Sequence, residues 1–272
     1  MIKGIILGAG TGKRLWPTTK LINKHFLNIY NKPMIYYPLS ILILSKIKDV
    51  LIVCNRNDLK NYKKLFQDGK QLGIKISYKI QKKANGIVGA MQECENFIKK
   101  DNFLLMLGDN FFYGNNLINN IQEILKKNVV PSVFTHTVSK PESFGIAEYD
   151  KYNNIKKIHE KPKKNYSSHA VLGMYFLDHK AIAYSKQLKI SKRGEYEIAD
   201  LLNIYLKKKD KIKNYHLDRG VTWFDMGTYD DYLNASLFVR IIEERQNLKI
   251  GDVYEAANLS GFIDKKKFNE IK

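Results

Sequence analysis

The chain has 272 residues, of which 44% are hydrophobic and 12% aromatic, so it can bury a large core and is expected to be globular rather than disordered. Its formal net charge of +19 would suit nucleic acid, an anionic membrane surface or a phosphorylated small substrate as partner. The lysines are spread along helix-like stretches instead of forming one block, which predicts a solvated basic surface and neither nucleic acid nor a membrane as partner.

Strand-like and helix-like segments alternate through the first half of the chain. Strands are expected at 3–7, 49–54, 75–79 and 102–107, with helices at about 34–46, 57–67, 86–99 and 116–127. The strand segments are short, β-branched and apolar on both faces, which is typical of a parallel sheet covered by helices. This pattern predicts an α/β fold, a Rossmann-like three-layer sandwich with a mostly parallel central sheet.

The pattern changes in the second half. Strand signals at 132–138, 145–149, 155–159 and 170–176 follow one another closely, which predicts an antiparallel insertion in this half. A helix at about 195–208, strands near 214–217 and 222–225, and a last long helix at about 228–246 complete the pattern. Because no linker rich in Pro, Gly or Ser interrupts the chain, residues 1–272 are expected to form a single domain with segments at 1–130, 131–228 and 229–272.

The cysteines and the longest apolar run bear on the compartment. Cys54 and Cys94 lie in apolar contexts without C-x-x-C spacing, so reduced thiols and a cytoplasmic location are expected. The first expected strand begins at residue 3, which leaves no room for a secretory leader. The longest apolar run, residues 39–44, is far too short to span a bilayer.

A glycine-rich loop follows the first strand. Gly8, Gly10 and Gly12 fall within five residues, and such glycines let the backbone bend tightly and offer N–H groups to an anion. Arg14 and Lys24 add positive charge, which is the layout of a phosphate-binding site. The spacing matches neither a P-loop nor a dinucleotide-binding fingerprint. A tight turn between strand and helix, without a ligand, is the alternative interpretation.

Two aspartates come directly after apolar strands. Asp109 comes soon after the apolar residues 103–107. Asp225 is the last residue of the expected strand at 222–225. A carboxylate at the end of a buried strand needs a partner, and Mg²⁺ is an apt one. Because ligands of parallel sheets bind beyond the carboxyl ends of the strands, the pair would hold Mg²⁺ at one edge. The alternatives are a turn-forming Asp109 and a helix-capping Asp225.

Three further charged residues lie at the ends of expected elements. Glu160 and Lys161 end a strand, where Glu160 would accept hydrogen bonds from sugar hydroxyls and Lys161 would contact a phosphate. A surface ion pair before a proline turn is the alternative. Arg193, just before a helix, is either a second anion contact or a component of an ordinary helix start.

The joint pattern, in this order, resembles the sugar-1-phosphate nucleotidyltransferases, and among them the bacterial glucose-1-phosphate thymidylyltransferases. The resemblance covers nearly the whole chain. It is carried by the loop from Gly8 to Pro17 with Lys24, and by residues 31–40 (NKPMIYYPLS), 107–110 (LGDN), 160–162 (EKP), 193–195 (RGE) and 243–246 (EERQ).

The resemblance implies a role for each matching position. Residues 1–130 would bind the nucleotide, residues 131–228 the sugar, and residues 229–272 would form a C-terminal helical segment. The nucleotide-binding residues would be Gly8, Gly10, Thr11 and Gly12 at the triphosphate, with Gln81 and Gly86 at the thymine edge. The catalytic pair would be Arg14 and Lys24, and the Mg²⁺ ligands Asp109 and Asp225. The sugar 1-phosphate would be bound by Gly145, Glu160, Lys161, Val171, Arg193 and Trp223.

The implied activity is Mg²⁺-dependent transfer of a nucleotidyl group from dTTP to glucose 1-phosphate, which gives dTDP-glucose for polysaccharide biosynthesis and releases pyrophosphate. The base-reading stretch departs from the family pattern, since residues 81–86 read QKKANG and Gly89 stands where a Gln is common. Another sugar 1-phosphate, UTP or CTP therefore remains an alternative, as does a non-catalytic nucleotide-sugar-binding relative.

An apolar stripe on the last long helix bears on assembly. It consists of Tyr232, Leu233, Leu237, Phe238, Ile241 and Ile242. The stripe either faces the core of its own subunit or joins subunits. Because the relatives assemble as dimers or tetramers, a homo-oligomer is expected.

Overall fold

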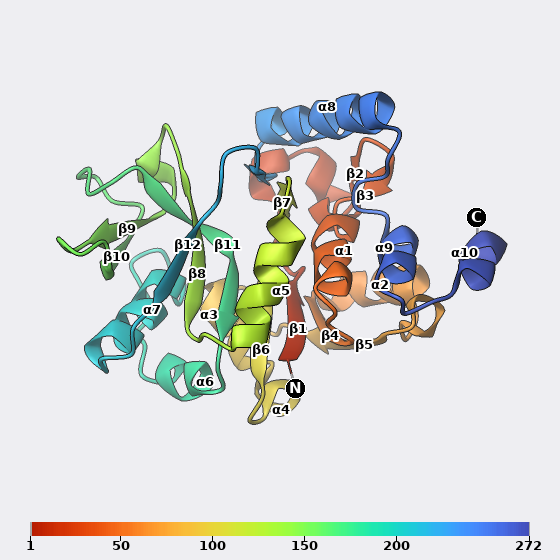
Figure 1. Cartoon of the computed structure of the whole chain (residues 1–272). Coiled ribbons are helices and arrows are strands. Elements are labelled where there is room, and N and C mark those ends of the chain that lie inside the picture. The colour runs from red at the N-terminus through yellow and green to blue at the C-terminus, as the bar shows by residue number, and fades with distance from the viewer. Residues whose placement is uncertain (1, 272) are drawn as a thin grey trace. The chain divides into compact units, whose positions relative to one another are not determined.

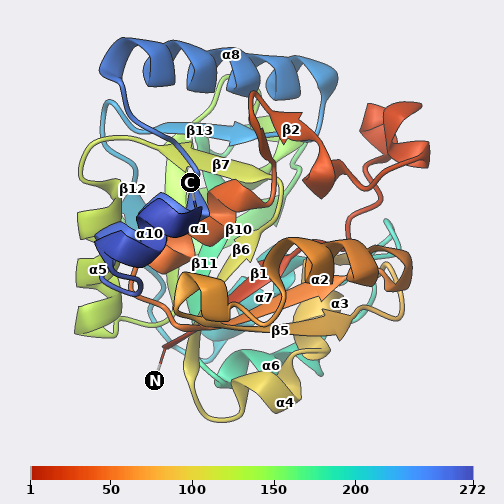
Figure 2. The ribbon, with the colours of Figure 1, turned by 90° about the vertical axis from the view of Figure 1, so that its right-hand side faces the viewer.

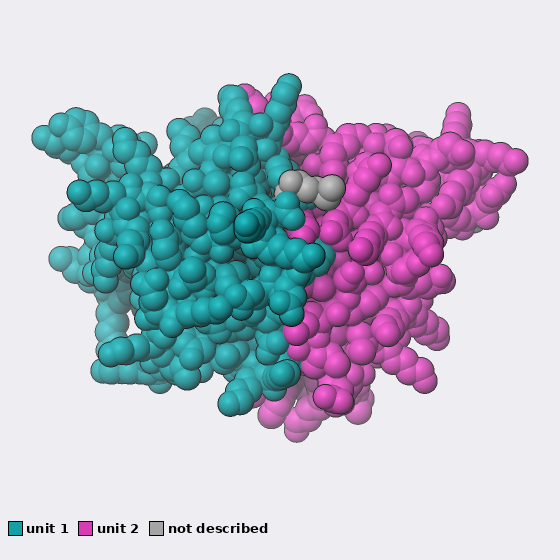
Figure 3. All heavy atoms as spheres, turned by 90° about the horizontal axis from the view of Figure 1, so that it is seen from below, with its two compact units in different colours: residues 1–2, 81–105, 124–219 teal, residues 3–80, 106–123, 220–272 magenta. Residues whose placement is uncertain are grey.

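The computed structural model describes residues 2–271 and divides into two compact units, which are coloured separately in Figure 3. Unit 1 contains Ile2 and residues 81–105 and 124–219, and unit 2 contains residues 3–80, 106–123 and those from 220 on. The units group residues by contact rather than in chain order. The expected division of a single domain at residues 130 and 228 stays a prediction.

Parallel strands form the centre of unit 2. In order they are β5 (Lys75–Ile80), β4 (Asp49–Cys54) and β1 (Ile2–Leu7), with Ile5 opposite Leu51 and Leu51 opposite Ser77. All three were expected from their sequence. After β1 and β4 the chain forms α1 (Tyr36–Leu44) and α2 (Leu59–Phe66). Helix α1 is apolar all round and accordingly almost wholly buried, whereas α2 packs one face against β5.

Smaller elements complete unit 2. A ribbon of β7 (Asn110–Tyr113) and β13 (Thr222–Asp225) lies beneath α8 (Tyr229–Gln246), as Figure 2 shows. The strand expected at 222–225 is confirmed, but its partner β7 was not expected. The other elements are the β2 (Asn28–Ile29) and β3 (Lys32–Pro33) hairpin, α9 (Val253–Leu259), α10 (Lys265–Ile271) and the first part of α5 (Leu117–Lys127), of which residues 124–127 belong to unit 1. Helix α9 packs on α1. Both α9 and α10 lie in the expected C-terminal helical segment, although the sequence analysis gave no bounds for either.

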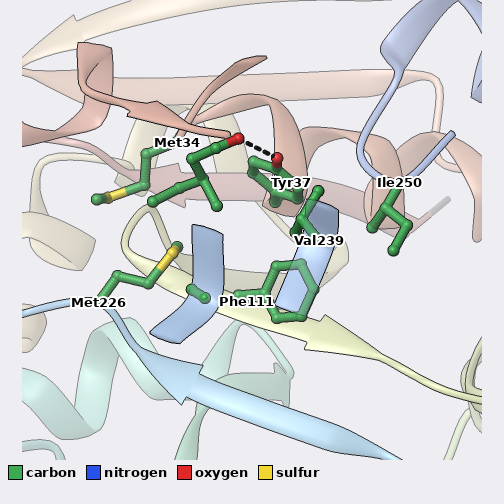
Figure 4. Close-up of a cluster of buried hydrophobic side chains, with 8 residues drawn as sticks. Met34, Tyr37, Phe111, Met226, Val239 and Ile250 are labelled. Carbon is green, nitrogen blue, oxygen red and sulfur yellow. Dashed lines mark hydrogen bonds between the residues drawn. The ribbon is translucent and has the colours of Figure 1, made fainter. Parts of the chain in front are cut away.

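A hydrophobic cluster joins distant segments of unit 2 (Figure 4). The buried phenol of Tyr37 donates a hydrogen bond of 2.6 Å to the carbonyl of Ile29, and its ring packs edge-on against Phe111 of β7. Met226 follows β13, and Val239 lies on α8. Because a fully buried large side chain contributes roughly 2–3 kcal/mol, this cluster fixes the β7–β13 ribbon against α1 and α8.

Mostly antiparallel strands form the sheet of unit 1 (Figure 1). Their order is β10 (Ile155–Glu160), β9 (Gly145–Tyr149), β11 (His169–Leu177), β8 (Ser132–Thr137) and β12 (Lys213–His216), and β6 (Asn102–Leu107) also neighbours β11. Strand β12 runs parallel to β8, whereas β8, β9, β10 and β11 pair antiparallel. The expected antiparallel second half and the α/β class are confirmed.

The helices of unit 1 are α3 (Gly86–Gln92), α4 (Glu95–Ile98), α6 (Lys180–Ser185) and α7 (Ile198–Lys207). The single helix expected at 86–99 was wrong, because a tight turn from Met91 to Cys94 separates α3 from α4. Short 3₁₀ turns occur in both units, at Lys13–Leu15, Thr18–Lys20, Lys24–Phe26, Arg56–Asp58, Lys70–Leu72 and Pro141–Ser143. Within residues 2–271, no helix is long and apolar enough to cross a membrane.

Buried Glu243 ties α8 to the β2–β3 hairpin. Its side chain is only 3% exposed and accepts hydrogen bonds from Lys32 Nζ at 2.7 Å, Asn31 Nδ2 at 3.1 Å and the Ile250 N–H at 2.8 Å. Burial alone would raise the pKa of Glu243, but these donors hold it below its usual value. The expected motif at 243–246 therefore contains a structural clamp within unit 2.

We predict that Glu243→Gln lowers the free energy of unfolding by roughly 2–4 kcal/mol, because it leaves the Lys32 ammonium buried without its counter-charge. Urea denaturation measures the loss. The matched control is Glu244→Gln, since Glu244 is 54% exposed and pairs with Arg240 on the surface of α8, which predicts a loss below about 0.5 kcal/mol. Equal losses in the two variants would contradict the clamp.

Candidate active site

The glycine-rich loop of unit 2 leaves a set of backbone donors unused. The Gly8 N–H donates to the Val53 carbonyl at 2.7 Å, so this residue extends the β1–β4 pairing. In the part of the chain that the structure describes, the N–H groups of Gly10, Thr11 and Gly12 donate to no protein acceptor. Gly12 has a φ of 62°, a left-handed conformation that favours glycine. The loop thus offers the donors of residues 10–12 to an anion, while that of Gly8 is already used.

The ends of two expected strands lie together, as the sequence predicted. The Gly108 N–H, just beyond β6, donates to the Leu7 carbonyl at the end of β1 at 2.9 Å. This contact brings Asp109 beside the 3₁₀ turn that begins at Lys24. Lys24 is 8% exposed, and its Nζ forms a salt bridge with Asp109 Oδ2.

The second aspartate arrives on the β7–β13 ribbon. Asp225 lies opposite Asn110 in the ribbon, and the Met226 N–H donates to the Asp109 carbonyl at 2.9 Å. Arg14 Nη2 lies 3.8 Å from Asp225 Oδ2, with the Arg14 side chain 62% exposed. Unit 2 therefore brings together Arg14, Lys24, Asp109 and Asp225, the four charged residues that the sequence predicted.

The two carboxylates differ in their electrostatic surroundings. Burial would raise the pKa of Asp109, but Lys24, together with His25 and the hydrogen bond from Asn110, outweighs burial and holds this pKa below its usual range. Burial and the negative charge of Asp109 raise the pKa of Asp225 to about 6, against the opposing effects of Lys24 and Arg14. The positive charges near Asp225 are therefore too weak to offset its burial and the charge of Asp109.

The donor set fits a hard divalent cation. Carboxylate oxygens suit Mg²⁺, which keeps several waters and uses one or two protein carboxylates together with substrate phosphates. Between residues 2 and 271, no group of three or more His, Cys, Asp or Glu side chains has the geometry to hold a metal ion. A site completed by phosphate oxygens therefore fits Asp109 and Asp225 better than an all-protein cage.

Asn110 supports Asp109 in a way that the sequence analysis did not foresee. Asn110 is 2% exposed, and its Nδ2 donates to Asp109 Oδ1 at 3.2 Å. Trp223 Nε1 in turn donates to Asn110 Oδ1 at 2.7 Å. Both oxygens of Asp109 therefore have protein partners, Lys24 and Asn110. The available signal was the Asp-Asn pair directly after a buried strand.

His25 is a second buried group that the sequence analysis missed. Its ring Nδ1 lies 2.7 Å from Asn23 Oδ1, and a Cβ on Gly108 would come within 2.7 Å of the ring. Burial lowers the pKa of His25 to about 3, and the positive charge of Lys24 contributes to this lowering. The ring is therefore a neutral packing group beneath the loop.

Unit 1 brings together several residues of the predicted sugar site. Glu160 ends β10 opposite Gly145 of β9, and Arg193 Nη1 donates to Glu160 Oε1 at 2.9 Å. Arg193 also bonds Glu197 at 3.3 Å. Burial and the charge of Glu197 raise the pKa of Glu160, while Arg193 opposes them. The two polar groups expected at the sugar are thus paired with each other.

Lys161 directly follows β10, and Val171 lies on β11 of the same sheet. The Lys161 N–H donates to the Phe144 carbonyl at 3.0 Å, and its φ is 43°. Val171 belongs to β11, whose Ala170 pairs with Ile146 of β9. The structure therefore places both residues around the β9–β10 pair that carries Gly145 and Glu160.

The predicted base-reading residues flank a short loop of unit 1. Gln81 directly follows β5, and Gly86 begins α3 with a φ of 91°. A Cβ on Gly86 would lie 2.9 Å from the Tyr196 carbonyl oxygen, so only glycine fits there. The Tyr196 N–H donates to the Asn85 carbonyl at 2.9 Å. The 81–86 loop thus packs against the segment that follows Arg193.

We predict that neutral His25 makes unfolding pH-dependent. The unfolded ring takes up a proton below its ordinary pKa of 6.5, whereas the folded ring stays neutral down to about pH 3. Its contribution to stability is therefore complete above pH 6.5 and falls by about 1.4 kcal/mol per pH unit as the pH drops. Urea titrations between pH 7 and 4 should give a flatter profile for His25→Asn. The control is exposed His179→Asn; a wild-type slope in His25→Asn would refute the assignment.

Comparison with known proteins adds sequence and fold relatives. Residues 3–241 match the Nucleotidyl transferase family. A glucose-1-phosphate thymidylyltransferase of Neisseria meningitidis is 40% identical over 270 residues, which cover 99% of this chain and 93% of the relative. One of Mycobacterium tuberculosis is 38% identical over 263 residues, covering 97% and 91%.

Solved structures also match the fold of this chain. A crystal structure from Bacillus anthracis, described as a glucose-1-phosphate thymidylyltransferase in complex with a sucrose, has a TM-score of 0.80 at 36% identity, covering 88% of this chain and 96% of that one. A UDP-glucose pyrophosphorylase complexed with UDP-glucose shares the fold, with a TM-score of 0.79 at 24% identity, covering 90% and 100%. The chain belongs to the nucleotidyl transferase family of enzymes.

Proposed function

We propose that this nucleotidyltransferase transfers a thymidylyl group from dTTP to glucose 1-phosphate, giving dTDP-glucose and pyrophosphate. The observation that carries the proposal is the convergence of Lys24, Asp109, Asp225 and Arg14 beside a loop with unused N–H donors. This combination suits a polyphosphate and a divalent cation. The thymidylyltransferase relatives, which match along almost the whole chain, support the choice of base and sugar.

The chemistry needs positioning and charge neutralisation more than proton transfer. An oxygen of the sugar phosphate forms a bond to the α-phosphorus, and the bond from that phosphorus to the bridging oxygen breaks, so pyrophosphate leaves with the electron pair. The attacking phosphate is already ionised at neutral pH, so no general base is required. Arg14 would stabilise the triphosphate and the leaving group as a bidentate donor, and Lys24 as a point charge.

We assign Asp109 and Asp225 as the residues that would hold Mg²⁺. When bound, the ion supplies positive charge to the phosphates as they react. Asn110 and Trp223 keep Asp109 oriented through their hydrogen bonds. The backbone donors of Gly10, Thr11 and Gly12 would bind phosphate oxygens from the loop.

The residues of unit 1 would bind the sugar and the base. We propose that Glu160 and Gly145 contact sugar hydroxyls, with Val171 beside them, and that Lys161 and Arg193 contact the sugar phosphate. Arg193 would then exchange its bond to Glu160 for one to phosphate. We further propose that Gln81 reads the thymine edge beside Gly86. The sugar contact expected of Trp223 stays a prediction.

We also propose a cytoplasmic location, because Cys54 and Cys94 are buried thiols that suit a reducing compartment.

The substrate assignment is tested by pyrophosphate release across a panel of triphosphates and sugar 1-phosphates. We predict the highest kcat/KM for dTTP with glucose 1-phosphate, because the matching relatives are thymidylyltransferases and because Gln81 suits cytosine only after an amide flip. UTP should follow and CTP should be poorest. A best rate with CTP would refute the base assignment, and no release with any pair would favour the non-catalytic alternative.

The metal assignment is tested by Asp225→Asn. We predict a fall in kcat of about a hundredfold or more, because the neutral amide no longer holds the cation whose charge stabilises the transition state. Circular dichroism should show an unchanged fold. The control is Asp230→Asn, since Asp230 is exposed nearby on α8, and its kcat should be that of wild type. Full activity in Asp225→Asn would remove this residue from the site.

The stripe on α8 supports a homo-oligomer, dimer or tetramer. Tyr232, Phe238 and Ile242 pack against the core of unit 2. Leu233, Leu237 and Ile241, spaced four residues apart, remain 55%, 45% and 54% exposed. The expected stripe thus has a core-facing side and an exposed apolar side, and we propose that a second copy covers the exposed side.

Light scattering tests the assembly. We predict an oligomer mass for the wild type and a shift toward the monomer in Leu237→Glu, because a charge would be buried at the subunit contact. The control is Tyr152→Glu, which changes a 72% exposed side chain of unit 1 and should keep the wild-type mass. A monomeric wild type would end the proposal.

A further inference from the structure

A hydrogen bond within the 81–86 loop concerns base selection. Gln81 Nε2 donates to Asn85 Oδ1 at 3.2 Å. The backbone of Asn85 is itself held, because its carbonyl accepts the Tyr196 N–H at 2.9 Å. The backbone that carries the Asn85 carboxamide is therefore held in place beside the Gln81 amide.

Gly89 makes room for this carboxamide. A Cβ at Gly89 would lie 2.0 Å from Asn85 Oδ1 and 2.5 Å from its Nδ2. Gly89 lies inside α3, where its backbone has no positive φ that would require glycine. The missing side chain is explained by the Asn85 carboxamide, which occupies the space one helical turn away. These contacts link the side chains of Gln81 and Asn85 to the space above Gly89.

The hydrogen-bonding groups of Gln81 and Asn85 bear on which pyrimidine base the 81–86 loop accepts. Thymine and uracil present an acceptor at O4 and a donor at N3, whereas cytosine presents a donor at N4 and an acceptor at N3. A glutamine amide matches either edge, depending on which of its ends faces the base. Asn85 can accept through Oδ1 or donate through Nδ2, so the side-chain amides of Gln81 and Asn85 can flip together.

We propose that Asn85 is a positioning residue for base selection and that Gly89 admits it. Asn85 Oδ1 accepts one hydrogen of Gln81 Nε2, which leaves the other hydrogen of Nε2 and the Oε1 of Gln81 to pair with the O4 and N3–H of a keto pyrimidine. As a carboxamide, Asn85 also permits the reversed orientation, so discrimination against cytosine is incomplete. The inference rests on the proposed role of Gln81 in reading the base.

The direct test is Asn85→Asp, assayed with dTTP and CTP at fixed glucose 1-phosphate. A carboxylate only accepts, so it fixes Gln81 Nε2 toward itself. The ratio of kcat/KM for dTTP to that for CTP should rise about threefold to tenfold, the scale of one hydrogen bond. The KM for glucose 1-phosphate should stay unchanged. An unchanged or lowered ratio would overturn the proposal.

Two further variants test the coupling. Asn85→Ala removes the orienting group and should lower both kcat/KM for dTTP and the dTTP-to-CTP ratio about threefold to tenfold. Gly89→Ala displaces the Asn85 carboxamide, keeps a good helix former in α3, and should reproduce that loss. The double variant should be no worse than either single one. Additive losses would overturn the proposal.

Controls separate this proposal from the function on which it rests. Lys83→Ala changes an exposed residue of the same loop and should alter both triphosphates equally. If Gln81→Ala leaves the ratio unchanged, Gln81 does not read the base, and both ideas fail. If Gln81→Ala changes the ratio but the Asn85 and Gly89 variants do not, this proposal alone fails. Calorimetric Kd values for the two triphosphates give the same ratio without turnover.

Discussion

The salt bridge between Lys24 and Asp109 is the interaction on which the site in unit 2 depends. A buried carboxylate stays ionised only with a partner, and here the Lys24 ammonium supplies it. The nearby Asp225 has Arg14 at 3.8 Å, and its pKa is nevertheless raised to about 6 by burial and by Asp109. A divalent cation would supply the charge that the pair lacks. It would also replace Lys24 at Asp109 and free that ammonium for a phosphate, so we propose that Lys24 and the metal would compete for one carboxylate.

The scaffold of unit 2 gives this charge arrangement its precision. Asp109 follows a buried strand, and the β7–β13 ribbon sets Asp225 opposite Asn110. The ribbon is held by the cluster around Phe111, and Glu243 ties α8 to the β2–β3 hairpin. Asp225 therefore comes from a strand and Asp109 from the short turn between β6 and β7, and the packing of these strands sets both positions, whereas Arg14 sits on an exposed turn and can adapt to a ligand.

Features with a local physical cause could be predicted from the sequence. Buried β-branched runs indicated β1, β4 and β5, and the rule that ligands bind at strand ends predicted the meeting of Asp109 with Asp225. Strand β7 was missed because it is four residues long and depends on a partner far along the chain. His25 and Asn110 were missed because their roles come from burial, which single-sequence patterns do not reveal. The link from Gln81 through Asn85 to Gly89 required side-chain positions.

The competition at Asp109 is tested most directly by Mn²⁺ binding to the nucleotide-free protein, followed by electron paramagnetic resonance. Lys24→Met removes the ammonium from Asp109 and its repulsion of a second cation, so the account predicts Mn²⁺ affinity raised by at least about tenfold. Exposed Lys20→Met should bind Mn²⁺ as the wild type does. Unchanged or weaker Mn²⁺ binding in Lys24→Met would contradict the account.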